Sequence, residues 1–352
     1  MKKEINLMLG TDYRGKGGIA FVLNNYKKNL LLKKINSKLI ITHRSNLGKL
    51  DLVMIFFNAL IKIIYYLIFY KVKIVHIHSA SNFSFFRKSI FLLICNFFSI
   101  KIFFHIHGGN FDFFYKNSNY FVKKFINFIF NKSNKIIVLN PYYKSFLKKN
   151  NIIKKIIIIP NSLVLKKNNK PSKIFKKKFV LFLGNLEKRK GVNDILDAIK
   201  IISKKKQSIN FIFCGVDHKD FYKNLAKSLK IEKNIRFIKW VSGKTKTNIL
   251  NNTKILILPS YNENLPVSIL EAMNNSIPVI STKVGGIPFQ VKHNFSGYLI
   301  KPGNNFQLAR CIIKLNFNKK LNKKFGERGN EIFQSKFSND IVFKKIINLY
   351  NN

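Results

Sequence analysis

Acidic residues are scarce in this chain of 352 residues, with 15 Asp and Glu against 64 Lys and Arg and a formal net charge of +49. Cysteine is scarcer still, and Cys95, Cys214 and Cys311 lie far apart. Their spacing excludes a disulfide framework or a zinc ribbon, so we expect a reducing cytoplasm. Because hydrophobic residues make up 47% of the chain, a disordered basic tail is excluded as well.

Arginine accounts for seven of the basic residues, and the lysines are spread along the whole chain. Proteins that read bases rely on the planar arginine fork, so the charge alone is weak evidence for nucleic-acid binding. Alanine, proline and glycine are few while Lys, Asn, Ile and Phe abound, which indicates drift toward A+T-rich codons. The glycines that remain, such as Gly17 and Gly18, therefore mark places where the backbone needs them.

Apolar, β-rich runs alternate with stretches of helical period in two successive sets, which predicts two parallel α/β domains. The polar, lysine-rich segment 161–178 separates the sets and reads as a linker. We assign a first domain at 1–165, a linker at 166–178, a second domain at 179–334 and a closing helix at 335–352. The predicted strands are Ile5–Leu9, Ile74–Ile77, Ile102–Ile106, Lys135–Leu139, Ile156–Ile159, Phe179–Leu183, Asn210–Cys214, Ile235–Ile238, Ile255–Leu258 and Val279–Ser281.

One apolar segment, Leu52–Tyr70, approaches the length of a membrane-spanning helix but contains Asn58 and Lys62. A span needs about 20 apolar residues, and a lysine in its middle costs roughly 2.5 to 3.5 kcal/mol. The segment also continues directly into a predicted strand. We therefore favour a helix packed against the sheet or lying on a membrane surface, with a true span as the alternative. No cleavable signal sequence is expected at the N-terminus.

Two carboxylates stand close together in the segment 256–286, where a strand is followed by a polar loop with Glu263 and a helix with Glu271. The helix is expected to start near Pro266, and its N-terminus offers N–H groups and positive dipole to a phosphate. A carboxylate is suited to accept hydrogen bonds from a vicinal diol such as a ribose. The alternative is that Glu271 stabilises the helix dipole on a solvated face.

The stretch PSYNENLPVSILEAMNNSIPVISTKVGG resembles the carboxy-terminal signature of the family 4 glycosyltransferases of the GT-B type. The signature residues present are Ser260, Glu263, Glu271, Ala272, Pro278, Val279, Gly285 and Gly286. The resemblance implies an α/β fold of two Rossmann-like domains whose parallel sheets face each other across a cleft. It also implies that the last helix crosses back to the first domain.

The stretch FVLFLGNLEKRKGVNDILDAI resembles the first strand, loop and helix of the family's second domain, which implies that Lys190 neutralises the donor diphosphate. Asn185 stands where the family usually has Arg. Either Arg189 supplies that charge or the diphosphate is held less tightly. The resemblance also places Trp240 and Val241 near the nucleobase, although a lone tryptophan is equally often a core residue.

In the first domain, LMLGTDYRGKGGIAFVL resembles the family's opening strand and glycine loop, so Gly17 and Gly18 would let the backbone approach the diphosphate or the acceptor. FFHIHGGNF resembles a strand that ends in a histidine near the donor sugar, here His107. A second interpretation is a metal site, because the pairs His76–His78 and His105–His107 place alternate side chains on one face of neighbouring strands.

The resemblance implies an enzyme that transfers a sugar, with retention, from a UDP-, GDP- or ADP-sugar to a glycan or lipid-linked acceptor. The expected setting is bacterial surface polysaccharide synthesis, meaning lipopolysaccharide, capsule or O-antigen. Glu271 would hold the ribose hydroxyls and Glu263 the sugar hydroxyls, with Asn264 and the N–H groups of Leu265 and Val267 around the phosphates.

No Asp-x-Asp motif occurs in the chain, which predicts that the reaction needs neither metal nor cofactor. The alternative function is a non-catalytic basic protein that binds nucleic acid or acts as a sugar-nucleotide scaffold. We expect no nucleic-acid partner.

Lysines in or beside apolar helices of the first domain form the mixture expected at an anionic membrane surface. They are Lys27, Lys28, Lys33, Lys34, Lys123 and Lys124. The sequence therefore predicts peripheral attachment at the inner face of the cell membrane, unless the charge is compositional drift alone.

Overall fold

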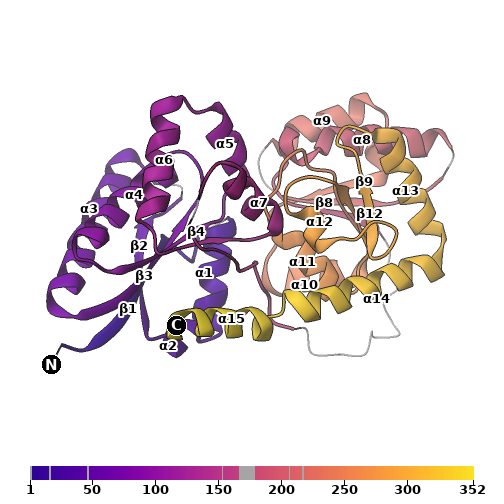
Figure 1. The fold of residues 1–352 in the computed structure, drawn as a ribbon. Coiled ribbons are helices and arrows are strands. Elements are labelled where there is room, and N and C mark those ends of the chain that lie inside the picture. Colours follow the sequence, from indigo (N-terminus) through magenta and orange to yellow (C-terminus); the bar gives the residue numbers. More distant parts are fainter. Residues whose placement is uncertain are drawn as a thin grey trace. The chain divides into compact units, whose positions relative to one another are not determined.

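The computed structural model describes residues 2–15, 17–45, 47–152, 154–165, 179–205, 207–215 and 218–352, which form two compact units (Figure 1). The first unit comprises Met1–Ser162 and Asn339–Asn352, and the second comprises Leu163–Ser338. Each contains a six-stranded parallel sheet with helices around it. The predicted α/β class with two Rossmann-like domains is confirmed. The linker predicted at 166–178 lies outside the described residues.

The sheet of the first unit has the strand order β2-β1-β3-β4-β5-β6. The strands are β1 Glu4–Thr11, β2 Ser37–His43, β3 Lys71–Ser79, β4 Lys101–Ile106, β5 Lys135–Val138 and β6 Ile156–Ile158. The winding reverses between β1 and β3, and open α/β sheets bind ligands at the carboxyl ends of the strands at such a switch point. The prediction missed β2, whose apolar run at residues 39–41 is only three residues long and lies between Lys38 and Thr42.

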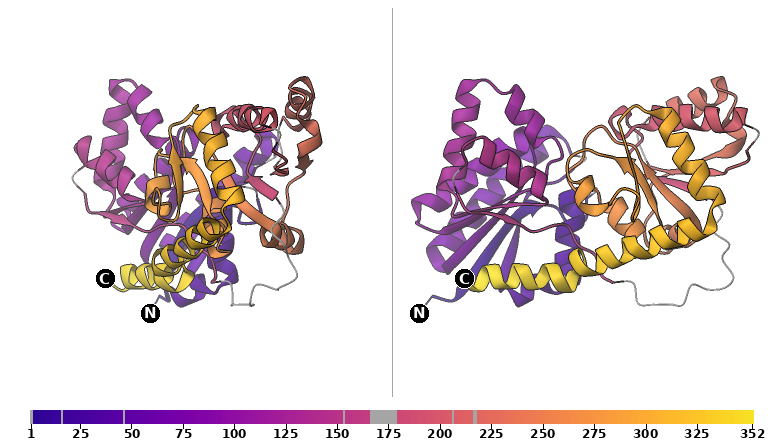
Figure 2. Two further views of the ribbon diagram at one scale, coloured as in Figure 1. Left: turned by 90° about the vertical axis from the view of Figure 1, so that its right-hand side faces the viewer. Right: turned by 45° about the vertical axis from the view of Figure 1, so that its right-hand side comes forward.

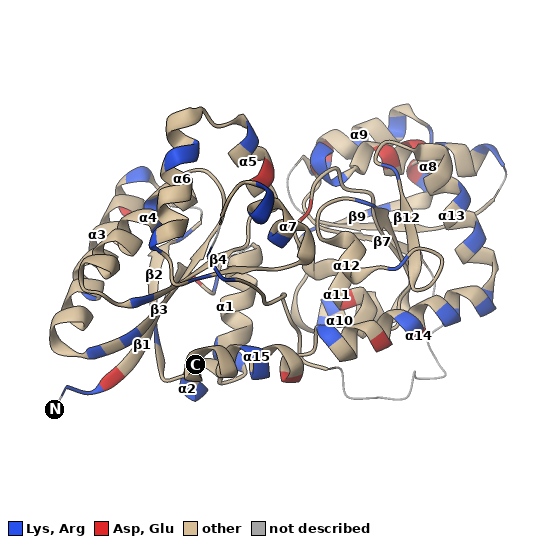
Figure 3. Cartoon of the chain, viewed as in Figure 1, with Lys and Arg blue, Asp and Glu red and all other residues tan. Residues whose placement is uncertain are grey.

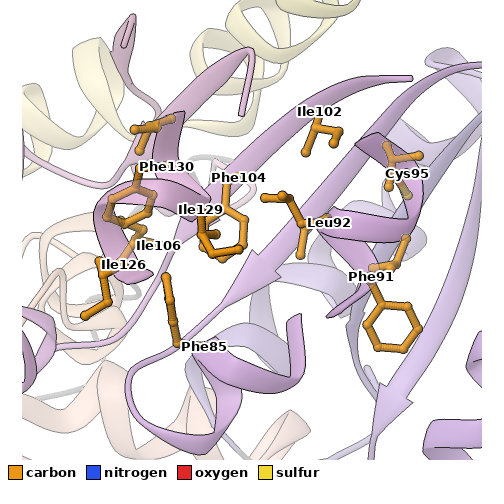
Figure 4. Packing of buried hydrophobic residues seen from close by; sticks show 14 of the residues in the cluster. Phe85, Phe91, Leu92, Cys95, Ile102, Phe104, Ile106, Ile126, Ile129 and Phe130 are labelled. Carbon is orange, nitrogen blue, oxygen red and sulfur yellow. The ribbon is translucent and has the colours of Figure 1, made fainter. Parts of the chain in front are cut away.

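Helices cover both faces of this sheet. They are α1 Gly18–Lys28, α2 Leu31–Lys34, α3 Lys49–Phe69, α4 Phe83–Phe97, α5 Phe111–Asn117, α6 Tyr120–Lys132, α7 Pro141–Lys149 and α15 Asn339–Asn351. On one face, α3 to α7 share a core in which the rings of Phe85, Phe104 and Phe130 meet edge to face (Figure 4). On the other face, α1, α2 and α15 share a second core.

The C-terminal helix α15 belongs to the first unit, where Val342, Phe343 and Ile346 pack with Tyr26 of α1 (Figure 2). It begins at Asn339, later than the expected 335, because the preceding helix α14 continues to Lys336.

The segment with a candidate membrane span forms α3, which begins at Lys49 and ends at Phe69, immediately before β3. Among the residues that the structure describes, α3 is the helix long and apolar enough to cross a membrane by length and composition. One side of it packs against the sheet through Ala59, Ile63 and Leu67.

The second unit has the strand order β12-β11-β10-β7-β8-β9, so its switch point lies between β7 and β10. The strands are β7 Phe179–Leu183, β8 Phe211–Cys214, β9 Ile235–Ile238, β10 Thr253–Leu258, β11 Val279–Thr282 and β12 Gly297–Ile300. The helices are η1 Lys188–Lys190, α8 Val192–Lys204, α9 Lys219–Ser228, η2 Glu232–Asn234, α10 Gly243–Asn252, α11 Val267–Asn274, α12 Ile287–Gln290, α13 Asn305–Phe317 and α14 Lys319–Lys336. The prediction missed β12, a strand of four residues.

Candidate active site

At the switch point of the second unit, the loops after β7 and β10 bring two predicted site residues together. Lys190, at the end of η1, forms an ion pair with the Oε1 atom of Glu263. The Ser260 hydroxyl donates a hydrogen bond of 3.1 Å to the same oxygen. The Lys190 and Glu263 side chains are only 16% and 9% exposed, so this ion pair is shielded from water. Charges in such a place act more strongly on a ligand than surface charges do.

Two glycines allow this close approach. Gly191 has a φ of +73°, and a Cβ there would lie 2.2 Å from the carbonyl oxygen of Pro259. Gly285 has a φ of +49°, and its Cβ would lie 1.7 Å from the carbonyl oxygen of Glu263. Another residue at Gly191 would force the loops after β7 and β10 apart, and another residue at Gly285 would force the loop after β11 away from Glu263. The glycines therefore set the position of Glu263 relative to Lys190.

Arg189 links the same two loops. Its Nη1 donates to the carbonyl oxygen of Asn262 at 3.0 Å, and its Nη2 lies 3.2 Å from Oε2 of Glu187. Asn185, which replaces the arginine usual in the family, donates to Oε1 of Glu187 at 3.1 Å. Glu187 was not predicted as a site residue. It orders both side chains and offsets part of the Arg189 charge.

Glu271 lies on α11 and forms an ion pair with Lys246 of α10. Burial raises the pKa of Glu271, and the neighbouring Lys246 ammonium opposes that rise. The side chain is 12% exposed, so the alternative of a solvated helix face is wrong. The sequence did not reveal Lys246, because nothing distinguishes it from its many lysine neighbours.

The loop that follows β10 leads directly into the N-terminus of α11. The helix begins at Val267, and Pro266 precedes it as a cap without a side-chain hydrogen bond. Asn264 and Leu265 are buried just before it. The Gln290 amide donates to the carbonyl oxygen of Pro266 at 3.0 Å and holds this entry to the helix in place. The first N–H groups of a helix lack intrahelical acceptors and are suited to bind an anion.

Trp240 and Val241 follow β9, which β8 separates from β7 and the Lys190–Glu263 pair. Trp240 is 42% exposed, so it is not the core residue that the alternative interpretation required. Val241 is buried beside it. The structure thus keeps the two predicted nucleobase residues at the outer part of the sheet.

In the first unit, β3 and β4 carry a cluster of four histidines. His76 Nε2 lies 3.2 Å from His105 Nδ1, and His78 Nδ1 lies 2.8 Å from His107 Nε2. The hydroxyl of Tyr350, on α15, lies 2.9 Å from His76 Nδ1. Burial lowers the pKa of His76 to about 3, and it also lowers the pKa values of His78, His105 and His107. The imidazoles are therefore neutral at pH 7.

The ligand nitrogens of His76, His78 and His105 all lie within 4.8 Å of one another, a spacing that could hold a metal ion. Both ring nitrogens of His76, however, already have hydrogen-bonding partners. The group contains no carboxylate to offset the charge of a buried cation. Nε2 of His78 and of His105 and Nδ1 of His107, by contrast, are buried without a hydrogen-bond partner among the described residues. The contacts therefore show a cluster of neutral imidazoles and leave the metal site as a second interpretation.

Gly17 and Gly18 lie in the loop after β1, at the switch point of the first unit. Gly17 has a φ of +119° and caps α1, whose first residue is Gly18. A Cβ added at either glycine would meet nothing within 4 Å. The space around the backbone is open here, and the binding of the diphosphate or the acceptor stays a prediction.

Two Rossmann-like units with loops at each switch point define the GT-B class, and solved structures of that class match the whole chain. Sucrose-phosphate synthase from Thermosynechococcus elongatus superposes with a TM-score of 0.80 at 16% identity, covering 99% of this chain and 98% of that one. HepE from Anabaena, in complex with UDP and glucose, superposes with a TM-score of 0.74 at 15% identity, covering 99% of both chains.

The sequence match is concentrated in the second unit, where residues 165–332 match the family described as glycosyl transferases group 1. The capsular polysaccharide biosynthesis glycosyltransferase CapM of Staphylococcus aureus is 26% identical over 194 residues, which are 53% of this chain and 49% of that protein. The chain spans about half the length of the first curated relatives it matches. The second unit is therefore similar to the glycosyl transferases group 1 family.

Proposed function

We propose that the protein transfers a sugar from a nucleotide-diphospho-sugar to a hydroxyl of a glycan or lipid-linked acceptor. The observation that carries this proposal is the shielded pair of Lys190 and Glu263 at the switch point of a unit that matches the glycosyl transferases group 1 family. The similarity to CapM favours synthesis of a bacterial surface polysaccharide as the setting, whether capsule, lipopolysaccharide or O-antigen. Because HepE was solved with UDP, a UDP-sugar is the first donor to test, before GDP- and ADP-sugars.

The ion pair suggests how the donor is held. Without donor, Lys190 and Glu263 neutralise each other. A diphosphate would compete for Lys190 and leave Glu263 Oε1 to accept hydrogen bonds from sugar hydroxyls. Arg189 and the N-terminus of α11 lie in or beside the same loops and add positive potential. Stabilising the charge that develops on the departing diphosphate is then the main catalytic contribution.

The proposal includes membership of family 4 and retention at the anomeric carbon. With donor bound, Glu263 would keep its contact with the Ser260 hydroxyl and accept hydrogen bonds from sugar hydroxyls, so we do not assign it as a covalent nucleophile. The acceptor oxygen would instead form its bond on the face from which the diphosphate leaves, and its proton would pass to the departing phosphate oxygen. His107, as a neutral imidazole, would hydrogen-bond a donor-sugar hydroxyl, and Glu271 would accept those of the ribose.

The proposed reaction needs no metal or cofactor. Lysine, arginine and a helix N-terminus would supply the positive charge that a bridging cation supplies in metal-dependent transferases. Transfer should therefore continue in excess EDTA. We further propose that the protein acts in the cytoplasm as a peripheral protein of the inner membrane face.

A matched pair of lysines tests the proposal. Lys190 and Lys188 lie on the same short helix, but Lys188 is exposed. Lys190→Ala should lower transfer from the preferred UDP-, GDP- or ADP-sugar by about 100-fold or more, whereas Lys188→Ala should stay within about twofold. Isothermal titration identifies the donor, and circular dichroism shows whether each variant is folded.

Near-normal turnover of Lys190→Ala would contradict the proposed sugar transfer, in which Lys190 binds the donor diphosphate. Donor binding without transfer to any acceptor would instead indicate a sugar-nucleotide scaffold. Salt-sensitive binding to DNA or RNA that Glu271→Gln leaves unchanged would indicate a nucleic-acid binder.

A further inference from the structure

The outward side of α3 is mostly apolar, although it also carries the exposed Asn58 and Lys62. A surface helix of a soluble protein normally carries polar residues on the side that faces water. Here the buried side is Ala59, Ile63 and Leu67, and the opposite side is exposed. The exposed stripe is Val53, Met54, Phe57, Ile61, Ile64 and Ile68, with Ile61 69% exposed. In Figure 3 most of α3 is uncharged.

Helix α4 extends this stripe sideways. It packs beside α3, with the rings of Phe56 and Phe91 5.4 Å apart between them. Its own exposed residues recur at helical spacing and carry no charge. They are Phe83, Phe86, Ile90, Leu93 and Phe97, with Phe97 84% exposed. Two adjacent helices thus present one continuous surface, which we call the α3–α4 face. Soluble monomers rarely expose an apolar surface of this kind without a partner.

Basic and aromatic side chains border the α3–α4 face. Phe86 of α4 stacks on Phe125 of α6, so α6 lies next to it. On α6, Lys124 and Lys132 lie over the rings of Tyr120 and Phe128, and both lysines are exposed. Residues 1–162 contain 27 Lys and Arg but only four Asp and Glu. An apolar surface with a lysine and aromatic border is typical of proteins that lie in the headgroup region of a bilayer.

The positive charge of the chain also indicates which partner covers the α3–α4 face. A second copy of the chain would bring another formal charge of +49 toward the same face, and like charges oppose such an association. An anionic bilayer attracts the lysines and takes up the apolar side chains at the same time. A spanning helix is disfavoured because the inward side of α3 is part of the core and α3 ends directly before β3.

We propose that the α3–α4 face inserts into one leaflet of an anionic bilayer, with α3 lying parallel to the surface. This deepens the membrane attachment proposed above and rests on that proposal for its biological setting. The outward stripe would enter to a depth of about 5 to 10 Å, with the α6 lysines at the phosphates. Lys62, on the exposed side of α3, would extend along the helix to reach the headgroups.

Vesicle sedimentation tests the insertion. The full chain should bind vesicles of phosphatidylcholine with phosphatidylglycerol, and part of this binding should persist at high salt, because salt screens charge but not apolar burial. The double variant Phe57→Glu, Ile61→Glu should weaken binding by about tenfold or more. Phe306→Glu is the matched control, since Phe306 is 76% exposed but lies on α13 of the second unit. It should bind like the unaltered chain.

A fluorescence measurement gives an independent answer if the double variant folds poorly. The chain has a single tryptophan, Trp240, in the second unit. Phe57→Trp in a Trp240→Phe background should show a blue shift and quenching by brominated phosphatidylglycerol, whereas Trp240 in the unaltered chain should show neither.

Failure of the unaltered chain to bind vesicles overturns the proposal. So does binding that the glutamate variant retains, or a lipid-free dimer that this variant converts to a monomer while vesicle binding remains. Donor titration of the same variant separates this result from the proposed function, because the outward side of α3 lies in the first unit and the Lys190–Glu263 pair in the second.

Discussion

In the first unit, the strands β3 and β4 hold four neutral histidines, whereas in the second unit the loops after β7 and β10 hold lysine and glutamate as ion pairs. Both sheets are parallel, six-stranded and wound about a switch point. The fold therefore sets where a site lies but not which charge it carries. The charge depends on a few side chains that the strand ends and loops present.

The two arrangements differ in what they can bind. An ion pair offers a full positive charge to an anion that displaces the carboxylate, which suits a diphosphate. Neutral imidazoles offer directional hydrogen bonds without attracting anions, which suits uncharged hydroxyls.

The largest effect is expected from Gly285→Ala, which breaks the geometry of the charged site. The new Cβ would lie 1.7 Å from the Glu263 carbonyl oxygen, so the Glu263 loop must move. A displacement of about 1 Å in a catalytic group commonly costs about 100-fold in rate, and we expect at least that loss of transfer. Kinetic assays and thermal unfolding measure both consequences.

Gly243→Ala is the control for that loss, because Gly243 has a similar φ of +55° but open space around it. It carries only the backbone strain of about 1 to 2 kcal/mol. Equal losses of transfer in the two variants would show that strain, and not displacement of Glu263, is the cause.

The four neutral histidines should make the free energy of unfolding depend on pH. Because burial lowers the pKa values of the four histidines, the unfolded chain binds more protons than the folded chain below pH 6.5. The free energy of unfolding should therefore fall as the pH is lowered from 6.5 to 5, by about 1.4 kcal/mol per pH unit for each histidine. His76→Phe should reduce the slope of the free energy of unfolding against pH by the contribution of one histidine, about 1.4 kcal/mol per pH unit.

Two probes separate the units in this experiment. Trp240 fluorescence follows the second unit, and far-ultraviolet circular dichroism follows both. The steep pH dependence should appear in the circular dichroism transition and not in the Trp240 transition. The exposed His218 provides the control variant His218→Gln, which should leave the slope unchanged. A slope equally unaffected by His76→Phe would mean that the cluster is not neutral in the folded chain.

Much of the fold could be predicted because buried parallel strands are continuous apolar runs. The predicted Phe179–Leu183 and Ile235–Ile238 coincide with β7 and β9. The edge strand β2 was not found this way, since its apolar run, at residues 39–41, is only three residues long. The strand β12 begins with Gly297 and so offers only three apolar residues, 298–300, before Lys301.

In the candidate site, the residues that could be predicted from composition are of a type that is rare in the chain. With 15 acidic residues in the chain, Glu263 and Glu271 stood out. The partner of Glu271 did not, because a single lysine among many carries no signal until the fold brings Lys246 of α10 against α11. The contact of Tyr350 with His76 likewise joins residues 274 positions apart, which no local pattern indicates.

The smallest effect concerns the second ion pair, and it sharpens the contrast between a site whose ligand affinity changes in acid and a site whose ligand affinity does not. Lys246 opposes the burial that raises the Glu271 pKa, so Lys246→Met should raise that pKa further. If Glu271 accepts hydrogen bonds from the donor ribose, donor affinity falls as the pH drops through its pKa. In Lys246→Met, that fall in donor affinity should begin about one pH unit higher than in the unaltered chain. Lys244→Met is the control, because Lys244 is exposed on the same helix, and the fall should begin there at the same pH as in the unaltered chain. Titration calorimetry across pH measures both, and identical profiles for the two variants would remove Glu271 from the donor site. His107→Gln should leave the profile in place, because a neutral imidazole has no charge to lose over that range.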